Sequence, residues 1–446
     1  MTSNTPKTTT TTTTTTIIAT TPPAFVWKSS PHRGHAYWHQ RSSSPEWIES
    51  SPSLVISSAK QKNMLPAKAL ESKASPLLSP AQVQMKQDAL AQARTLYEHY
   101  QKTKPTIADT VRPTVFTDPS QVSHMMRHQD IDTVLFDCDG VIYRHMDPCP
   151  GAAETIRLLN KTKKVLFVSN NGAVSRQQLR DKLVKVLNLP QIQVEQCISS
   201  AYSTAKNLQG QLLSNDSNTT SRRNPPRVHM IGTDGLKKQL EHHGFRVHRL
   251  EDDDTPSSHE SRMTHAQVQD HTFPTEPFDA VVIGHDTDFH FRKIVTATNI
   301  LAKNPKALLV ATDLDSHDVV GSQSNHMPGN GPLVRCIEAS SGRTAVDCGK
   351  PGRTLAKLLQ QEYDLPDLAR CLFVGDRLSS DIAFANRNGM KSLLVLTGVT
   401  TAQTLMKDLP PKGTERDPLP HYICPFIGYL NPTTDTRMSM IQIRDQ

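Results

Sequence analysis

Short apolar runs alternate with amphipathic segments over much of this chain. The apolar runs have the length of strands and cover residues 134–136, 165–168, 371–374 and 392–396. The amphipathic segments have helical periodicity and cover residues 152–160, 176–187, 355–362 and 383–388. Near-continuous apolar strands separated by amphipathic helices predict a doubly wound parallel sheet of the Rossmann-like α/β class. Ligands of such sheets bind at the carboxyl ends of the strands.

A second strand–helix series lies inside the first. Its apolar runs cover residues 227–231, 279–283 and 307–311, and its amphipathic segments cover 235–244 and 291–304. We therefore predict an inserted α/β domain at residues 203–332, between the two halves of a core at 114–202 and 333–430. Residues 431–446 are predicted to be a C-terminal tail.

The first 110 residues lack this alternation. They contain an unbroken threonine run from Thr8 to Thr16 and Ser/Pro-rich sequence, so we predict a disordered, basic extension. A helix is predicted within it at residues 81–102, as a peripheral or linker helix. A second helix, at residues 120–127, is predicted after the extension and leads into the first apolar run. The hydroxyl-rich, acid-poor start is compatible with an organelle transit peptide. Its arginine is sparse, however, which favours an extension that carries no targeting signal. We expect a cytoplasmic protein, with a mitochondrion or plastid as the alternative.

Composition narrows the class of protein. Hydrophobic residues make up 36% of the 446 and aromatic residues 5%, which indicates a globular part diluted by a polar one. Residues 1–110 hold 12 Lys or Arg and 6 Asp or Glu, so they carry most of the net charge of +7, and no nucleic-acid groove is indicated. No apolar run approaches the roughly 18 residues of a membrane span. The seven scattered cysteines form no Cys-x-x-Cys, which favours a reducing compartment without disulfides or zinc.

Two aspartates follow the apolar run at residues 134–136. In Asp137-Cys138-Asp139-Gly140, strand alternation would direct both carboxylates to one face. Carboxylates held that close repel each other, so one stays protonated unless a cation neutralises the pair. The pair could supply a nucleophile and a proton carrier, or bind a hard cation such as Mg²⁺. A plain Asp-Gly turn explains the same residues.

Two further motifs carry groups that suit phosphate. Ser169, Asn170 and Asn171 follow an apolar run and offer a hydroxyl and backbone amides for phosphate oxygens, or simply cap the next helix. Lys350, between a glycine and a proline, could neutralise phosphate and aspartate together, or be a solvated loop lysine.

A fourth motif again places carboxylates after an apolar run. Asp376 follows the run at residues 371–374, and Asp381 comes five residues later, near the start of a predicted helix. One carboxylate can complete a Mg²⁺ shell while the other orients a ligand. Asp381 as a plain helix cap is the alternative.

In this order, the four motifs resemble the haloacid dehalogenase (HAD) superfamily of phosphotransferases. The resemblance is closer to the 4-nitrophenylphosphatase/phosphoglycolate phosphatase family, which has an inserted C2-type cap. It covers about residues 114–430, and the segments that carry it are residues 136–141, 150–152, 169–171, 199–202, 328–331, 349–351 and 375–382. The inserted domain would then serve as a lid that excludes water.

The resemblance implies catalytic and phosphate-binding roles. Asp137 would be the nucleophile that forms an aspartyl-phosphate, and Asp139 would protonate the leaving alcohol and then activate water. Ser169 and the neighbouring amides would hold the phosphoryl oxygens. Lys350 would bridge the nucleophile and the phosphate.

The resemblance also implies a metal site. Mg²⁺ would be bound by Asp137, the backbone carbonyl of Asp139 and Asp376, with Asp381 supporting. This fits phosphoryl transfer, which needs positioning and neutralisation of charge.

The implied substrate is a small phosphorylated metabolite. 2-Phosphoglycolate leads, and pyridoxal phosphate, glycerol phosphate or a broad range typified by 4-nitrophenyl phosphate are alternatives. Family members often have Leu-Trp where this chain has Ile142-Tyr143, and the cap loops look longer or altered. These departures concern the substrate rather than the chemistry. A homodimer through the cap is left open.

The motifs disfavour two other classes of protein. A catalytically silent binding or scaffold protein, with the extension as its interaction segment, is disfavoured because Asp137, Asp139, Lys350 and Asp376 are all present. A nucleotide-binding enzyme is disfavoured because no Gly-x4-Gly-Lys-Ser/Thr or Gly-x-Gly-x-x-Gly stretch follows a strand.

Overall fold

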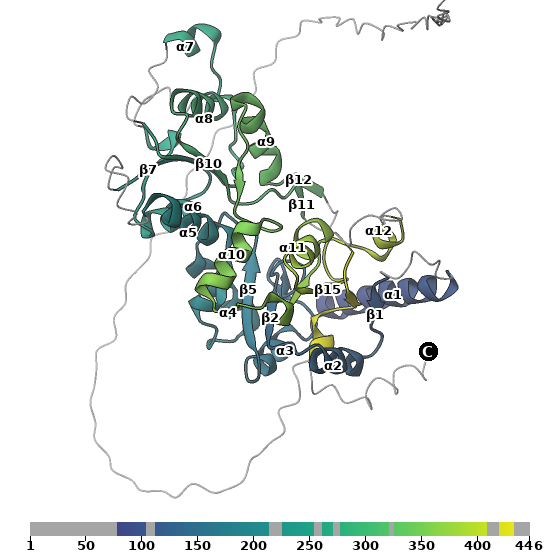
Figure 1. The fold of residues 1–446 in the computed structure, drawn as a ribbon. Helices are drawn as coiled ribbons and strands as arrows, with labels where there is room; N and C mark the ends of the chain where they lie inside the picture. The colour runs from purple at the N-terminus through teal and green to yellow at the C-terminus, as the bar shows by residue number, and fades with distance from the viewer. Residues whose placement is uncertain are drawn as a thin grey trace, which may run out of the picture. The chain divides into compact units, whose positions relative to one another are not determined.

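The computed structural model describes residues 78–103, 112–213, 225–253, 261–270, 277–320, 325–407 and 419–431. All of them belong to one structural unit, residues 74–446 (Figure 1). The interpretations given to residues 1–77, including the transit peptide, and to the tail after residue 431 lie outside the described residues.

The larger sheet has seven strands, and every pairing that joins them is parallel. In spatial order the strands are β1 (Thr114–Val115), β16 (Tyr422–Cys424), β15 (Lys391–Val395), β14 (Cys371–Gly375), β2 (Thr133–Phe136), β5 (Lys164–Ser169) and β6 (Cys197–Ser199). From β2 the chain first builds toward β6 and later continues on the other side with β14. The order therefore reverses between β2 and β14, which is the switch point where such sheets bind ligands. The predicted doubly wound parallel fold is confirmed.

Both faces of this sheet are buried, which explains the near-continuous apolar strands. In β2, Val134 and Phe136 belong to one hydrophobic cluster and Leu135 to the cluster on the opposite face. The first face is covered by α2 (Pro119–His128), α3 (Ala152–Leu159), α4 (Arg176–Leu187) and α12 (Ala402–Lys407). The second face is covered by α10 (Arg353–Glu362) and α11 (Ala383–Arg387). Among the described residues, short 3₁₀ turns occur at Val194–Gln196, Leu250–Asp252, Leu368–Arg370 and Ile427–Leu430.

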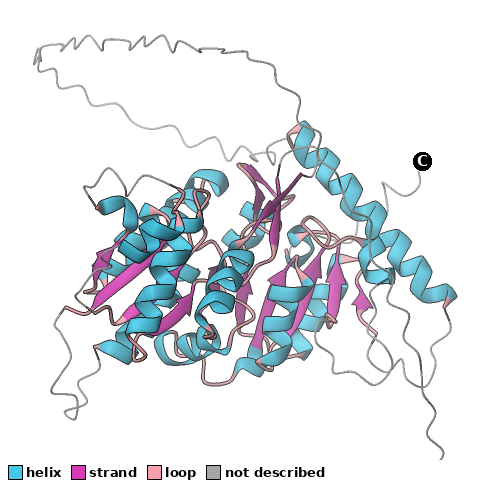
Figure 2. Cartoon of the chain, turned by 90° about the horizontal axis from the view of Figure 1, so that it is seen from above, coloured by secondary structure: helices cyan, strands magenta, loops and turns pink. Residues whose placement is uncertain are grey.

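The second strand–helix series forms a sheet of its own. In spatial order its parallel strands are β13 (Val346–Asp347), β10 (Leu308–Ala311), β9 (Ala280–Ile283), β7 (Arg227–Ile231) and β8 (Arg246–His248). One face packs on α5 (Ser200–Leu212) and α6 (Asp234–His242), the other on α8 (Phe291–Lys303) and α9 (Asn330–Ser341). A short helix, α7 (His265–Asp270), precedes β9. Figure 2 shows both sheets with helices against them.

The inserted segment is longer than predicted. The boundary at residue 332 is wrong, because α9 buries Leu333, Val334 and Ile337 against the second sheet and β13 pairs with β10. Neither element has a strong periodic pattern, so the sequence did not indicate that the inserted domain continues beyond residue 332. We use the name inserted segment for residues 200–347.

Two hairpins are not predicted by the apolar pattern. The β3–β4 hairpin, with β3 at Tyr143–Arg144 and β4 at Asp147–Pro148, follows β2. The β11–β12 hairpin, with β11 at His317–Val320 and β12 at Asn325–Pro328, leaves the inserted segment after β10. Their strands have only two to four residues each and are largely polar in sequence, so a search for apolar runs does not find them.

The N-terminal helix α1 (Pro80–Lys102) does not act as a linker. Ser79 caps it, and Met85, Ala89, Ala93 and Leu96 are buried in the same cluster as one face of the seven-stranded sheet. Its buried positions recur at helical spacing, but the stripe is narrow and two of its four residues are alanines. The interpretation as a linker is therefore corrected: α1 is packed on the core.

Two expectations from composition can be compared with the described residues. None of their helices combines the length and the apolar character needed to cross a membrane. All seven cysteines are free thiols, and all except Cys336 are buried.

Candidate active site

The candidate site lies where β2 and β14 end side by side. Phe136 pairs with Val374 across these strands, and the Asp137 amide donates to the Val374 carbonyl at 2.9 Å. The chains then leave the sheet, so Asp137 and Asp376 emerge next to each other. Gly140 follows with a φ of +84°, a conformation that L side chains rarely adopt, which allows the sharp turn into the β3–β4 hairpin.

Lys350 is the centre of the site. Its ammonium lies 2.5 Å from Asp137 Oδ1 and 2.8 Å from Asp381 Oδ1, and donates to the Val168 carbonyl at 3.0 Å. Only 1% of the Lys350 residue surface is exposed. Burial lowers the pKa of Lys350, but attraction to Asp137 and Asp381 outweighs burial and raises it, so the side chain is a permanent cation. The lysine predicted to bridge nucleophile and phosphate therefore contacts Asp137, the residue predicted to be the nucleophile.

Asp381 is held by a distorted helical turn. It lies in the π-helical turn η4 (Leu378–Ile382), and its Oδ2 accepts hydrogen bonds from the backbone amides of Asp376 and Arg377 at 3.1 and 3.0 Å. A Cβ on Gly375 would collide with Asp381, so the glycine is needed for this close approach. Asp381 is thus a bridge between Lys350 and the loop that carries Asp376, rather than a plain helix cap.

Three buried carboxylates meet at this point. Ligand atoms of Asp137, Asp376 and Asp381 lie within 4.8 Å of one another. Burial and repulsion among them raise the pKa of Asp137 above its usual range, against the opposing pull of Lys350, and raise that of Asp376 to about 7. One lysine cannot neutralise three carboxylates. The donor set therefore fits a hard divalent cation such as Mg²⁺, which prefers oxygen ligands.

Asp139 lies apart from this cluster. Its side chain is 55% exposed, and Oδ1 lies 3.5 Å from the ammonium of Lys182, which itself sits 3.8 Å from the ring centroid of Tyr143. Desolvation raises the pKa of Asp139, and Lys182 opposes the rise. A carboxyl of raised pKa in the lining of a cavity can act as a general acid and a general base. The sequence placed Lys182 on a helix but gave no sign of this contact.

The Ser-Asn-Asn motif ends β5, beside β2. Asn170 makes two hydrogen bonds with the Lys350 backbone, accepting from its N–H at 2.8 Å and donating to its C=O at 2.9 Å. Ser169 Oγ accepts from the Asn171 amide at 3.2 Å, and Asn171 Oδ1 accepts from the Ala173 amide at 3.0 Å. The predicted phosphate motif therefore also fixes the loop of the lysine.

All eight predicted site residues line one cavity of about 700 Å³. The members of the predicted set that line it are Asp137, Asp139, Ser169, Asn170, Asn171, Lys350, Asp376 and Asp381. Groups that follow strands of both sheets thus converge, as expected of a site at a switch point.

Sequence reasoning missed residues that join the two sheets over this cavity. Arg377 donates to the His317 carbonyl at 2.8 Å and to Asp318 Oδ1 at 3.2 Å, both on the β11–β12 hairpin. Asp315, also from the inserted segment, accepts from Asn170 Nδ2 at 3.1 Å. Arg377 adjoins Asp376 in the recognised motif and could have been suspected. Asp315 has no local signal.

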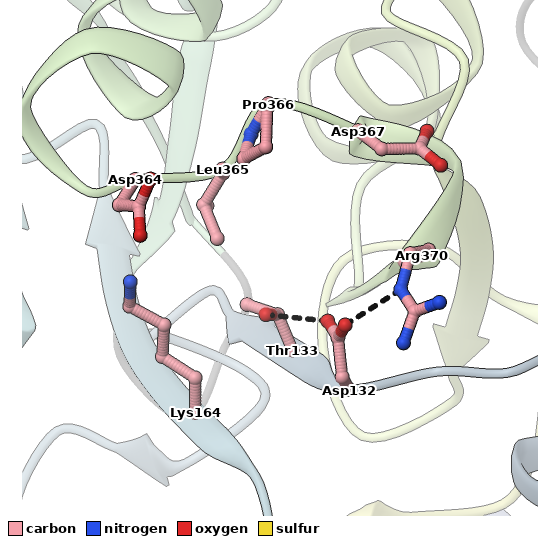
Figure 3. Close-up of a pocket in the computed structure, with 8 residues that line it drawn as sticks. All are labelled: Asp132, Thr133, Lys164, Asp364, Leu365, Pro366, Asp367 and Arg370. Atoms are coloured by element: carbon pink, nitrogen blue, oxygen red, sulfur yellow. Dashed lines mark hydrogen bonds and ion pairs between the residues drawn. The ribbon is translucent and has the colours of Figure 1, made fainter.

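A smaller pocket of about 290 Å³ lies at the opposite ends of the strands. It includes Asp132 and Thr133, at the start of β2, and Lys164, at the start of β5. Figure 3 shows Asp132 held there by Thr133 and by Arg370. This pocket is on the amino-terminal side of the sheet, so it has no part in the site at the carboxyl ends.

Known families match both halves of the core. Residues 134–246 match the family described as haloacid dehalogenase-like hydrolase, and residues 347–423 match a second, described as HAD-hydrolase-like. Chronophin of Mus musculus is 34% identical over 298 residues, which is 67% of this chain and 91% of chronophin. Phosphoglycolate phosphatase 2 of Arabidopsis thaliana is 31% identical over 292 residues, 65% of this chain and 89% of that protein.

A solved structure is also similar. The glycerol phosphate phosphatase of Mycobacterium tuberculosis, solved in complex with magnesium, has a TM-score of 0.51 and 26% identity, covering 68% of this chain and 75% of that one. The fold, the two family matches and the curated relatives agree with one another. This chain belongs to the haloacid dehalogenase-like hydrolases, as a phosphoric monoester hydrolase.

Proposed function

We propose that this chain is a Mg²⁺-dependent phosphatase of small phosphomonoesters that works through an aspartyl-phosphate on Asp137. One observation carries the proposal: the buried Lys350 holds Asp137 at 2.5 Å at the base of a cavity that Asp376 and Asp381 also line. Ion pairing with Lys350 opposes the rise in the Asp137 pKa that burial causes, and so favours the ionised carboxylate that a nucleophile requires.

The side chains divide the chemistry into two steps. First, a carboxylate oxygen of Asp137 attacks phosphorus, the bond to the leaving oxygen breaks, and Asp139 gives that oxygen its proton. Next, Asp139 takes a proton from water, the water oxygen bonds to phosphorus, and the bond to Asp137 breaks. Lys350 and the Ser169 hydroxyl stabilise charge on the phosphoryl oxygens.

The metal would be held by Asp137, Asp376 and the backbone carbonyl of Asp139, with Asp381 fixing the loop of Asp376. When bound, Mg²⁺ supplies charge neutralisation for the phosphoryl group and orients it. Three buried carboxylates with a single lysine support this assignment.

For the substrate we propose 2-phosphoglycolate. The similarity to a phosphoglycolate phosphatase supports it, and so do the cationic side chains of Arg144 and Arg377 in the cavity lining, which suit a second anionic group. Glycerol phosphate, pyridoxal phosphate and 4-nitrophenyl phosphate remain competitors. A cavity of about 700 Å³ has room for each of them.

A phosphate-release assay with these four esters, each with Mg²⁺ and with EDTA, tests the proposal. We expect release only with Mg²⁺ and the highest kcat/KM for 2-phosphoglycolate. A higher value for another ester would replace the substrate and leave the chemistry intact. Equal, metal-independent release in the wild type and in Asp137→Asn would contradict the proposal and favour a silent scaffold.

A further inference from the structure

Helix α1 lies against the active-site cavity, although it precedes the segments that match the known families. Met85, Asp88 and Gln92, spaced along one side of the helix, line the same cavity as Asp137 and Lys350. The helix also packs against α12 (Figure 1). It comes close to β4 as well. Helix α1 therefore forms part of the wall of the site.

Gln92 binds both ends of one loop. Its Oε1 accepts from the Ala402 amide at 3.0 Å, and its Nε2 donates to the Leu396 carbonyl at 3.4 Å. Both partners lie more than 300 residues from Gln92 in the sequence. The two hydrogen bonds join Gln92 to the two ends of the loop between β15 and α12. A single half-buried amide thus fixes where this loop starts and where it ends.

The 396–402 loop donates hydrogen bonds to Asp376, the residue proposed to bind the metal. The Val399 amide donates to Asp376 Oδ2 at 2.6 Å, and the Thr400 amide donates to the Asp376 carbonyl at 3.1 Å. Thr397 Oγ1 donates to the Gly140 carbonyl at 2.6 Å, next to Asp139. The loop therefore orients groups from the ends of both central strands.

A second glutamine of α1 binds the other side of the cavity. Gln82 Nε2 donates to the Pro148 carbonyl at 3.1 Å, in the β3–β4 hairpin, while Gln82 also completes the capping box with Ser79. The start of α1 is thus attached to the hairpin that follows Asp139, and its middle is attached to the loop that grips Asp376.

We propose that α1 is a brace for the metal site, and that Gln92 is a positioning residue which holds Asp376 through the 396–402 loop. The inference rests on the proposed binding of Mg²⁺ by Asp376. Groups that orient a metal ligand set its affinity because they prevent the ligand from turning away. Gln92 touches neither substrate nor metal in this account, and acts only through the loop.

The test compares Gln92→Met with Gln84→Met in the full-length protein. Methionine keeps the length and the helix propensity of glutamine but cannot accept from the Ala402 amide. Gln84 is on the same helix, and the one hydrogen bond of its side chain within the described part of the chain is to Asp88. Isothermal titration with Mg²⁺ and no substrate gives the Kd directly, and hydrogen exchange of residues 396–402 in EDTA reports the loop itself.

We expect Gln92→Met to raise the Mg²⁺ Kd about tenfold and to speed exchange of the 396–402 loop, whereas Gln84→Met changes neither. Asp376→Asn is the reference for loss of the ligand. A wild-type Kd in Gln92→Met, while Asp376→Asn weakens binding, overturns the brace alone. Unchanged binding in Asp376→Asn, or none in the wild type, overturns the metal assignment and the brace with it. Should Gln92→Met fail to fold, Gln92→Ala is measured with the same two readouts.

Discussion

At the scale of single residues, Lys350 has two functions. It neutralises Asp137 and Asp381 in the interior, and it is the cation nearest to the proposed nucleophile. A buried ion pair is costly to break, because the partner that remains is left as an uncompensated charge. The same residue should therefore matter for stability and for chemistry.

Replacing Lys350 by Met should lower the free energy of unfolding by about 3–5 kcal/mol, since Asp137 and Asp381 lose their counter-charge. Urea unfolding in EDTA at neutral pH measures this. The matched control is Lys182→Met, which removes the 31%-exposed partner of Asp139 and should cost no more than about 1 kcal/mol. Equal losses in the two variants would contradict this, because the buried ion pair would then contribute no more to the free energy of unfolding than the exposed one.

The sequence could suggest the residues of the site but not their contacts. For Asp137 and Asp381 it left a turn and a helix cap open as alternatives. Lys350 decides against both, yet it is 213 residues away from Asp137. No local pattern encodes such a contact, since it arises only when strand ends meet. Asp315 and Lys182 were missed for the same reason.

At the scale of elements, glycines let loops approach the buried carboxylates. A Cβ on Gly398 would collide with the carboxylate of Asp376. Gly398 lies in the 396–402 loop, so this loop is held both by the hydrogen bonds of Gln92 and by its close contact with Asp376.

Gly398→Ala should displace Asp376 and weaken Mg²⁺ binding by at least about tenfold, measured by titration of the metal without substrate. Gly210→Ala is the control, because Gly210 is inside α5 with no atom within 4 Å of an added Cβ. That substitution should raise the free energy of unfolding by up to about 1 kcal/mol and leave Mg²⁺ binding unchanged. Unaltered Mg²⁺ affinity in Gly398→Ala would contradict this prediction, because the loop would then accommodate the added methyl group without displacing Asp376.

The second sheet contains a buried histidine that should make the protein sensitive to acid. His229 in β7 is 1% exposed, its Nδ1 lies 3.0 Å from His248 Nδ1, and its Nε2 has no hydrogen-bond partner among the described residues. Burial lowers the pKa of His229 to about 3, with repulsion from His248 adding to the effect.

Because the unfolded chain binds this proton more readily than the folded one, stability should fall as pH drops from about 6.5 toward about 3. Between pH 7.5 and 5 the loss from His229 alone is about 2 kcal/mol. His229→Phe should reduce the fall in urea-unfolding free energy over this interval by that amount. His242→Phe, on the exposed side of α6, should not. The same pH dependence in wild type and His229→Phe would refute the assignment.

Most of the longer elements follow from the sequence, and the short ones do not. The strand and helix predicted at residues 227–231 and 176–187 are present with those same bounds as β7 and α4. Strands such as β1 and β13 have two residues each and exist only through pairing with a neighbour. The periodic patterns that mark a buried face cannot mark such elements.

At the scale of the whole molecule, the site is assembled from three separate parts of the chain. The core supplies Asp137, Lys350 and Asp376, the inserted segment supplies Asp315 and the β11–β12 hairpin, and α1 adds a wall. The expected lid role of the inserted segment remains a prediction, although Arg377 already ties the hairpin to the core. The chain order of these parts was readable in the motifs, whereas the participation of α1 was not.

A carboxylate oxygen of Asp137 should form a covalent bond to phosphorus during turnover, and this aspartyl-phosphate can be trapped. The protein is mixed with Mg²⁺ and the preferred ester, quenched with acid during turnover, and treated with borohydride, which reduces an aspartyl-phosphate to homoserine. Peptide mass spectrometry should then find homoserine at position 137 and at no other aspartate, and none in Asp137→Asn or in EDTA. Phosphate release without any modification at position 137, or with homoserine at another aspartate, would contradict the account.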